Sequence, residues 1–146
     1  MRSNTIESKA IKLEPVSVDG KAYFKISNND KMRPFFMSIV SDSNHWMFIS
    51  SNGGLTAGRK NSEYALFPYY SDDKITESSE ITGAKSIFQI HKNGKSYIWE
   101  PFSIRFGDNY NTRQNLFKSV YGNSVIFEEE NLDLGLIYRY EWCTSN

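Results

Sequence analysis

The stretch LFKSVYGNSVIFEEENLDLGLIYRYEWCT, residues 116–144, decides the fold class of this 146-residue chain. Its first part holds two runs with β-branched and aromatic residues, 116–121 and 124–130, on either side of the turn dipeptide Gly122-Asn123. In its last run, residues 134–144, every second position from Leu136 to Trp142 is leucine or aromatic, which is the period of a strand with one buried face. The stretch therefore predicts three consecutive antiparallel strands.

Two further hairpins are indicated by Asp19-Gly20 and Asn93-Gly94, because both dipeptides suit the tight turn between antiparallel strands. Turn residues separate the other apolar runs at short spacing, which is typical of a sandwich or barrel. The expected strands are 11–18, 21–27, 35–41, 46–51, 65–70, 86–92, 96–102, 116–121, 124–130 and 134–144. We therefore predict one all-β domain over residues 1–146, an antiparallel β-sandwich of about ten strands.

One segment also fits a helix. Within residues 113–121, Leu116, Phe117 and Val120 would share a helical face. The segment is short for a helix, so a strand is the preferred interpretation.

Composition excludes several classes of function. The chain has 17 basic and 17 acidic residues, so it lacks the positive field that phosphate-backbone binding needs, and we expect no nucleic-acid partner. No apolar run approaches the roughly 20 residues that span a bilayer, so we expect no membrane partner. The single Cys143 and the polar N-terminus without a signal-like apolar segment favour a reducing compartment, the cytoplasm, with the periplasm as the alternative.

Three sequence patterns resemble functional motifs without completing them. Residues 53–60 have the glycine spacing of a phosphate-binding loop, but Arg59-Lys60 stands where Lys followed by Ser or Thr is needed. The carboxylates around Asp72-Asp73 lack the spacing of a calcium loop. His45 and His91 have no Cys or His at ligand spacing. We therefore expect no metal, no cofactor and no catalytic residues.

Residues 52–74 concentrate glycines, a basic pair, aromatics and carboxylates between two expected strands. Sugars stack their apolar faces on aromatic rings and bond their hydroxyls to fixed donors and acceptors. We expect glycines 53, 54 and 58 to hold a loop that places Arg59 beside Tyr69, Tyr70 and Asp72 as a carbohydrate site. The alternative is an Arg59–Asp72 ion pair that only fixes the loop.

The three tryptophans are further candidates for stacking on sugars. Trp46 and Trp142 share strand faces with other aromatic residues and are interpreted as core. Trp99, which shares a face with Tyr97, is the best candidate for an exposed platform.

With these residues in view, the chain resembles the N-terminal β-sandwich modules of carbohydrate-active enzymes of the cellobiose phosphorylase type. The resemblance covers residues 35–74 and 115–146 as a diffuse pattern of strands and aromatic residues rather than a diagnostic motif. The segments that carry it are 46–50, 54–59, 67–70, 125–128 and 138–142. It implies a galactose-mutarotase-like supersandwich that packs on a separate helical catalytic domain and often forms a homodimer.

Two classes of function remain open. The chain also ends directly after an aromatic strand, so we expect it to be the N-terminal module of a longer polypeptide. In the first class it is a non-catalytic accessory module of a glycoside hydrolase or phosphorylase, with the helical domain as its partner. In the second it is a free-standing module that binds carbohydrate or protein through exposed aromatic residues.

Overall fold

The structure, a computed structural model, describes residues 10–65, 85–103 and 109–144. The described residues form ten strands and two short 3-10 helices. Their bounds are β1 (Lys12–Val18), β2 (Lys21–Ser27), η1 (Asn29–Lys31), β3 (Phe36–Val40), β4 (His45–Ser50), β5 (Leu55–Arg59), η2 (Ser62–Tyr64), β6 (Phe88–Lys92), β7 (Lys95–Trp99), β8 (Thr112–Ser119), β9 (Ser124–Asn131) and β10 (Leu136–Cys143).

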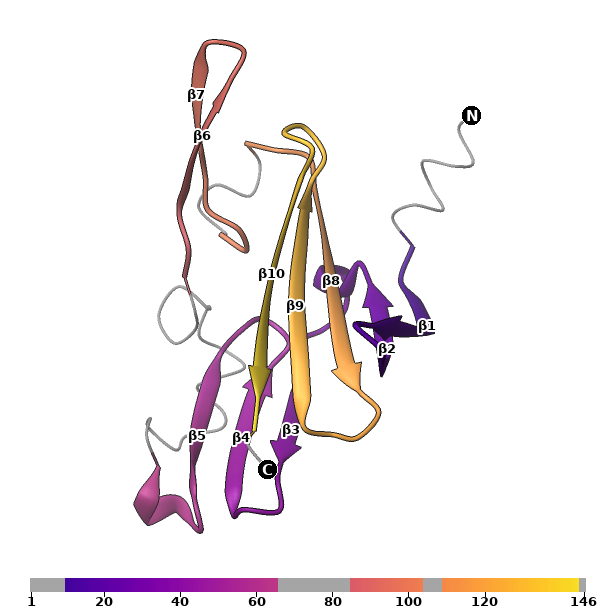
Figure 1. Ribbon diagram of the computed structural model, residues 1–146, viewed down its shortest axis with the longest axis vertical. Coiled ribbons are helices and arrows are strands. Elements are labelled where there is room, and N and C mark those ends of the chain that lie inside the picture. Colours follow the sequence, from indigo (N-terminus) through magenta and orange to yellow (C-terminus); the bar gives the residue numbers. More distant parts are fainter. Residues whose placement is uncertain (1–9, 66–84, 104–108, 145–146) are drawn as a thin grey trace.

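The strands form three antiparallel sheets (Figure 1). The largest has the order β1-β2-β8-β9-β10, and its long strands β8, β9 and β10 run along the length of the molecule. A second sheet, β3-β4-β5, packs on one face of these strands near one end, and the hairpin β6-β7 extends at the other end. The predicted all-β, antiparallel sandwich of about ten strands is thereby confirmed.

The predicted hairpin turns have the backbone conformation that their residues favour. Asp19 and Gly20 have φ values of 50° and 79°, and Asn93 and Gly94 have 53° and 73°. Consecutive residues in this left-handed region give the turn whose twist matches the flanking strands. The pairings β1–β2 and β6–β7 follow directly from these two turns.

The main core lies between the two larger sheets. We call the face of β8, β9 and β10 that points toward β3-β4-β5 the inner face. Residues with 9% or less of their surface exposed fill the space from both sides, and they are Met37, Ile39, Ile49, Leu55, Leu116, Val125 and Phe127. Lys118 adds a polar link between the sheets, because its Nζ donates to the carbonyl oxygen of Ser38 at 2.9 Å.

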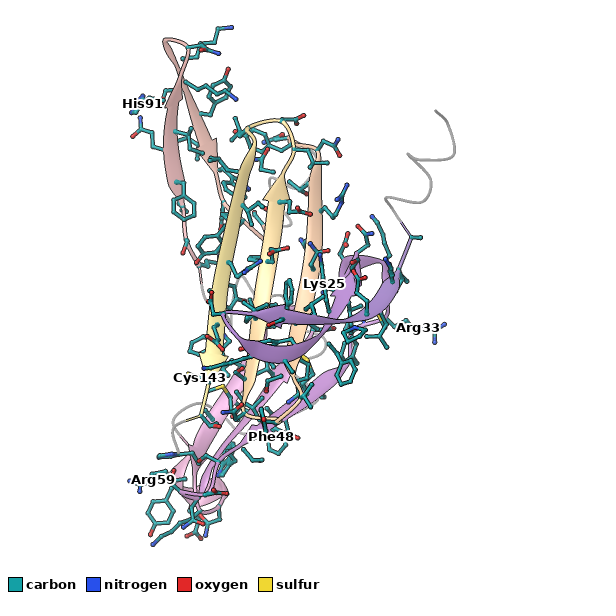
Figure 2. The ribbon with its side chains drawn as sticks, turned by 45° about the vertical axis from the view of Figure 1, so that its right-hand side comes forward. Lys25, Arg33, Phe48, Arg59, His91 and Cys143 are labelled. Atoms are coloured by element: carbon teal, nitrogen blue, oxygen red, sulfur yellow. The ribbon has the colours of Figure 1, made fainter. Side chains whose placement is uncertain are left out.

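The opposite, outer face of β8, β9 and β10 carries a smaller core and an ion pair. The β1-β2 hairpin crosses this face (Figure 2), where Tyr23 packs on Phe117 and Ile126. Glu128 is 3% exposed and is bonded by Arg139 from β10, whose Nε lies 2.9 Å from Oε2. A buried carboxylate needs such a partner, because an unpaired buried charge is strongly unfavourable.

The preferred strand interpretation of the segment 113–121 is confirmed, since β8 runs from Thr112 to Ser119 and pairs with both β2 and β9; it begins four residues earlier than the expected strand 116–121. Another segment differs from the sequence prediction. The strand β5, Leu55–Arg59, was expected to be loop, and it pairs with β4 throughout. The expected strand 65–70 lies outside the described residues apart from Ala65, which forms an isolated bridge with Gly58.

Candidate functional site

A pocket of about 230 Å³ lies where η1 and the turn between β4 and β5 meet the inner face. We call it the seam pocket. Aromatic side chains and uncharged polar groups together make up most of its wall. The residues that line it are Asn29, Asp30, Met32, Pro34, Ser51, Asn52, Gly53, Phe102, Gln114, Phe127 and Tyr140.

Three aromatic rings of the seam pocket pack on one another. Phe127 and Tyr140 are opposite each other on β9 and β10, and their rings stack with centroids 5.1 Å apart and planes 14° apart. Phe102 meets the edge of this pair, with its ring centroid 5.5 Å from that of Tyr140. Its backbone has a φ of 62°, a strained conformation for a bulky residue that the surrounding structure has to hold.

Glu129 holds Phe102 in this conformation. Its Oε1 accepts hydrogen bonds from the backbone N–H of Phe102 at 3.1 Å and from Nε2 of Gln114 at 3.2 Å, and its Oε2 accepts one from Nε1 of Trp99 at 2.8 Å. Burial raises the pKa of Glu129, the three donors oppose the rise, and the negative charge of Asp30 adds to it. The net shift is upward, so burial outweighs the hydrogen bonds.

Asn29 supplies a buried amide to the seam pocket. Its side chain is 6% exposed, and its Nδ2 donates a long hydrogen bond of 3.5 Å to the carbonyl oxygen of Ser51. Its Oδ1 has no hydrogen-bond partner among the described residues. A buried acceptor without a partner costs about 1–3 kcal/mol of stability. This oxygen is therefore a polar group that the folded chain itself leaves unsatisfied.

The 3-10 helix that carries Asn29 is fixed by the residue before it. Asn28 has a φ of 56°, a left-handed conformation that asparagine adopts more readily than most residues. Its backbone N–H donates to Oδ1 of Asn115 at 3.3 Å, and its Nδ2 donates to the carbonyl oxygen of Ala10 at 2.8 Å. The first bond ties the start of η1 to β8 and the second ties it to the segment before β1, and together they set the position of the next residue, Asn29.

The turn between β4 and β5 forms another side of the seam pocket. Oγ of Ser50 accepts a hydrogen bond from the backbone N–H of Gly54 at 2.9 Å and donates one to Oδ1 of Asn52. Gly53 has a φ of 96°, where a side chain would be strained. Hydrogen bonds within the turn therefore fix its conformation without a ligand.

Tyr140 lines the seam pocket and carries a largely buried hydroxyl. Burial raises the pKa of Tyr140, and the neighbouring Tyr138 adds to the rise. The hydroxyl stays protonated at neutral pH and makes no hydrogen bond with another residue in the described part of the chain. It can both donate and accept a hydrogen bond.

Trp99, the predicted stacking platform, is buried instead. Its side chain is 3% exposed, packs on Phe88 with ring centroids 5.9 Å apart, and donates its indole N–H to Glu129. The expectation of an exposed ring at this position has to be corrected, because the end of β7 packs against the inner face. Trp99 supports the seam pocket through Glu129 and is not one of the residues that line it.

Of the four candidate residues in 52–74, only Arg59 lies within the described residues. Arg59 is exposed and is the last residue of β5, where it pairs with His45 of β4. It lies at the opposite end of the molecule from His91 of the β6-β7 hairpin (Figure 2). Arg59 lines a second, more open pocket of about 640 Å³ together with Trp46 and Tyr64. Tyr69, Tyr70 and Asp72 lie outside the described residues, so their expected meeting with Arg59 stays a prediction.

Of the residues that line the seam pocket, only Asn52 and Gly53 belong to the stretch 52–74 that was predicted to form the site. Asn29 lies in a segment interpreted as a loop, and Phe102 was placed at the end of a strand. The signal that could have located the aromatic pair was the hairpin register, which sets Phe127 opposite Tyr140 on the inner face. Nothing in the sequence indicates that η1 packs against the same face.

The described residues contain no group of three or more His, Cys, Asp or Glu side chains that could hold a metal ion. Within the same residues, no helix is both long enough and apolar enough to cross a membrane.

A comparison with protein-family models gives no match, and a comparison with curated proteins gives no significant match.

Proposed function

We propose that this chain is a non-catalytic, carbohydrate-binding β-sandwich module that accompanies a larger carbohydrate-active enzyme, of the glycoside hydrolase or phosphorylase type. The observation that carries the proposal is the seam pocket, in which aromatic rings and uncharged amide groups face the same small volume. This is the combination that a sugar needs, since its C–H faces pack on rings and its hydroxyls need fixed hydrogen-bond partners.

Among the described residues at the seam pocket, the carboxyl groups are already engaged, which supports a binding role. Hydrolysis of a glycoside needs two carboxyl groups, one on each side of the scissile bond. Asp30 lines the pocket and forms an ion pair with Lys31 at 3.3 Å, whereas both oxygens of Glu129 already accept N–H donors. A carboxyl group engaged in this way is poorly placed to transfer a proton to a ligand.

An accessory role is supported by apolar side chains at the end of the sandwich near the β8–β9 turn. Val40, Val120 and Tyr121 are 55%, 53% and 84% exposed, and the hydrogen bond from the backbone N–H of Val40 to the carbonyl oxygen of Gly122 brings their segments together. Exposed apolar clusters are frequent where another protein surface packs. We propose that this apolar end packs against a helical catalytic domain, and that in the isolated chain two copies of it pack together in a homodimer.

The alternative, a free-standing module that binds carbohydrate or protein, uses the same two surfaces without a catalytic domain. The two proposals differ in one measurable respect. An accessory module gains stability or solubility from a helical domain in the same polypeptide, whereas a free-standing module remains a monomer at high concentration.

The test is a binding and turnover survey on the purified chain. Isothermal calorimetry against a panel of soluble mono- and oligosaccharides should give saturable binding, and activity assays with aryl glycosides, with and without inorganic phosphate, should give no turnover. Phe102→Leu removes a ring from the seam pocket and should weaken binding, whereas Tyr121→Leu removes an exposed ring elsewhere and should not. No binding to any carbohydrate, or equal affinity of both variants, would contradict the proposal.

A further inference from the structure

We infer that β10 of one copy of this chain pairs with β10 of a second copy, antiparallel and symmetric, so that the two five-stranded sheets become one continuous sheet. This inference goes beyond the proposed function, because it names a contact surface separate from the apolar end near the β8–β9 turn. It starts from the position of β10 as the last strand in the order β1-β2-β8-β9-β10 (Figure 1). Among the described residues, no strand pairs with the side of β10 that faces away from β9, which we call its free edge.

The free edge of β10 lacks the residues that usually protect an edge strand. Proline and lysine in an edge strand prevent it from pairing with another chain. The opposite edge strand of the same sheet, β1, contains Lys12 and Pro15. The segment Leu136–Cys143 contains neither proline nor lysine, and it pairs with β9 without interruption. The free edge is therefore open to a further strand.

The hydrogen bonds to β9 show which backbone groups of β10 point toward the free edge. The N–H of Thr144 donates to the carbonyl oxygen of Asn123 at 3.0 Å, and these residues continue the register in which Cys143 is opposite Ser124. Bonded and non-bonded pairs alternate along an antiparallel ladder, so the even-numbered residues of β10 direct their backbone groups toward β9. The odd-numbered residues direct theirs toward the free edge, and they are Ile137, Arg139, Glu141 and Cys143.

This alternation and the side-chain charges together select one register for the second copy. When Tyr140 lies opposite Tyr140 of the second copy, odd-numbered residues meet odd-numbered residues, and their free N–H and C=O groups can bond. Arg139 is then opposite Glu141 of the second copy, and the two-fold symmetry forms this pair twice. A register centred on Arg139 or on Glu141 would instead place like charges opposite each other.

Both charged side chains have atoms available for this contact. Nε and Nη2 of Arg139 bond Glu128, whereas Nη1 has no partner among the described residues. Oε1 of Glu141 accepts from the hydroxyl of Tyr23, and within the same residues Oε2 has no partner. The arginine side chain is 43% exposed, and Glu141 is exposed as well. The pair between copies therefore adds to the existing bonds without replacing them.

The neighbouring pairs in this register are mainly apolar. On the outer face, Ile137, which is 62% exposed, meets the exposed Cys143 of the second copy. On the inner face, Tyr138 meets Trp142 of the second copy, and both residues are only half-buried in the single chain. Cross-strand pairs of aromatic residues stabilise a sheet. Pairing at the free edge would thus cover exposed apolar surface on both faces.

Ile137→Cys tests the register directly. Opposite residues of an antiparallel pair have Cα atoms about 4.5–5.5 Å apart, within the range that a disulfide bridges. The new thiol should therefore form a disulfide with Cys143 of the second copy when oxidised glutathione is added as the electron acceptor. The two thiols of one chain lie about 20 Å apart along the strand and cannot reach each other. A non-reducing gel should show a covalent dimer that disappears when Cys143→Ser is added.

The matched control is Leu13→Cys. Leu13 is 66% exposed and lies on β1, the opposite edge of the sheet, so its thiol should not meet Cys143 of another copy. This variant should remain a monomer on the non-reducing gel. Equal cross-linking of both variants, or no cross-linking of Ile137→Cys, overturns the inference.

Glu141→Lys provides the second arm, measured by sedimentation equilibrium. All proteins in this arm carry Tyr121→Ser, so that association through the apolar end does not contribute. The dissociation constant of the dimer should rise at least about tenfold, because lysine would face Arg139 in both symmetric pairs. Added salt should also weaken the wild-type pair, since the charges are exposed.

The control for this arm is Glu63→Lys, the same charge change on η2, where the side chain is exposed. Its dissociation constant should stay within twofold of the value without the substitution. An unchanged dimer in Glu141→Lys, or an equal loss in Glu63→Lys, overturns the inference. Ile137→Cys keeps both charges of the pair, so the cross-linking result decides if Glu141→Lys does not fold. Neither result changes what is expected of carbohydrate binding.

Discussion

Replacing Gly58 by alanine tests how closely β5 packs against its neighbours. A Cβ atom at this position would lie 2.5 Å from Cζ2 of Trp46, 2.7 Å from the carbonyl oxygen of Tyr64 and 2.9 Å from Cα of Ala65. All three distances are shorter than real Cβ contacts, and two of the three involve the backbone, which cannot turn aside as a side chain can. The glycine therefore serves close packing between β5 and the segment around Ala65.

The expected cost follows from these contacts. Overpacking a folded interior costs about 1–3 kcal/mol, and two backbone contacts place this substitution at the upper end, about 3 kcal/mol. Alanine also lowers the conformational entropy of the unfolded chain, which stabilises the folded protein by about 0.4–1 kcal/mol. The net loss for Gly58→Ala is therefore about 2 kcal/mol in the free energy of unfolding. For a chain of this size that lowers the melting temperature by about 4–8 °C.

The assay is urea unfolding followed by tryptophan fluorescence, with Gly122→Ala as the matched control. A Cβ at Gly122 would have no atom within 4 Å, but its φ is 79°, so the control measures left-handed strain without a clash and should cost about 1–2 kcal/mol. Trp46→Leu combined with Gly58→Ala should cost less than the sum of the single changes. A Gly58→Ala protein within 0.5 kcal/mol of wild type, or strictly additive changes, would refute the close-packing argument.

Three further changes test the outer face and the support of the seam pocket. Arg139→Met leaves the buried Glu128 without its charged partner, while Nδ2 of Asn115 still donates to its Oε1 at 2.8 Å. Because the arginine side chain is 43% exposed, the loss should be about 2 kcal/mol, below the 3–5 kcal/mol of a fully buried pair. Adding Glu128→Gln should restore part of this loss in chemical denaturation. Burial raises the pKa of Glu129 above 4.5, so the folded protein keeps this proton to higher pH than the unfolded chain does. Stability measured in thermal melts should therefore fall as the pH rises from about 4.5 through the raised pKa. Glu129→Gln should flatten that pH dependence. Tyr23→Phe removes a hydroxyl that lies 3.0 Å from Oε1 of Glu141 and 3.1 Å from Oγ of Ser124, and it should cost about 1 kcal/mol in the free energy of unfolding. Little change would show that these two bonds together contribute nothing net.

The hairpins of this fold could be predicted because their signals are local. Asp19-Gly20 and Asn93-Gly94 specify a turn by the backbone angles that their own residues tolerate. The alternation in β10 likewise requires only that one face of the strand be buried. Each of these features depends on residues within a few positions of one another, so the sequence contains what is needed.

The strand β5 shows where local signals fail. Its residues Thr56, Ala57 and Gly58 include two with low strand propensity, and they form a strand because β4 pairs with them and Trp46 covers the glycine. In β5, tertiary pairing outweighs propensity. The segment 113–121 is the opposite case, because the strand preferred from the sequence is the one that forms, as β8 between β2 and β9.

The seam pocket depends on contacts between segments that are far apart in the sequence, which explains why sequence reasoning did not locate it. Asn29 and Gln114 line the same pocket, and Glu129 bonds both Gln114 and Phe102, although these residues come from separate parts of the chain. The polar network behind the pocket fixes Phe102 in a strained conformation, and η1 leaves an amide oxygen unsatisfied beside it. Both features lower the stability of the free chain.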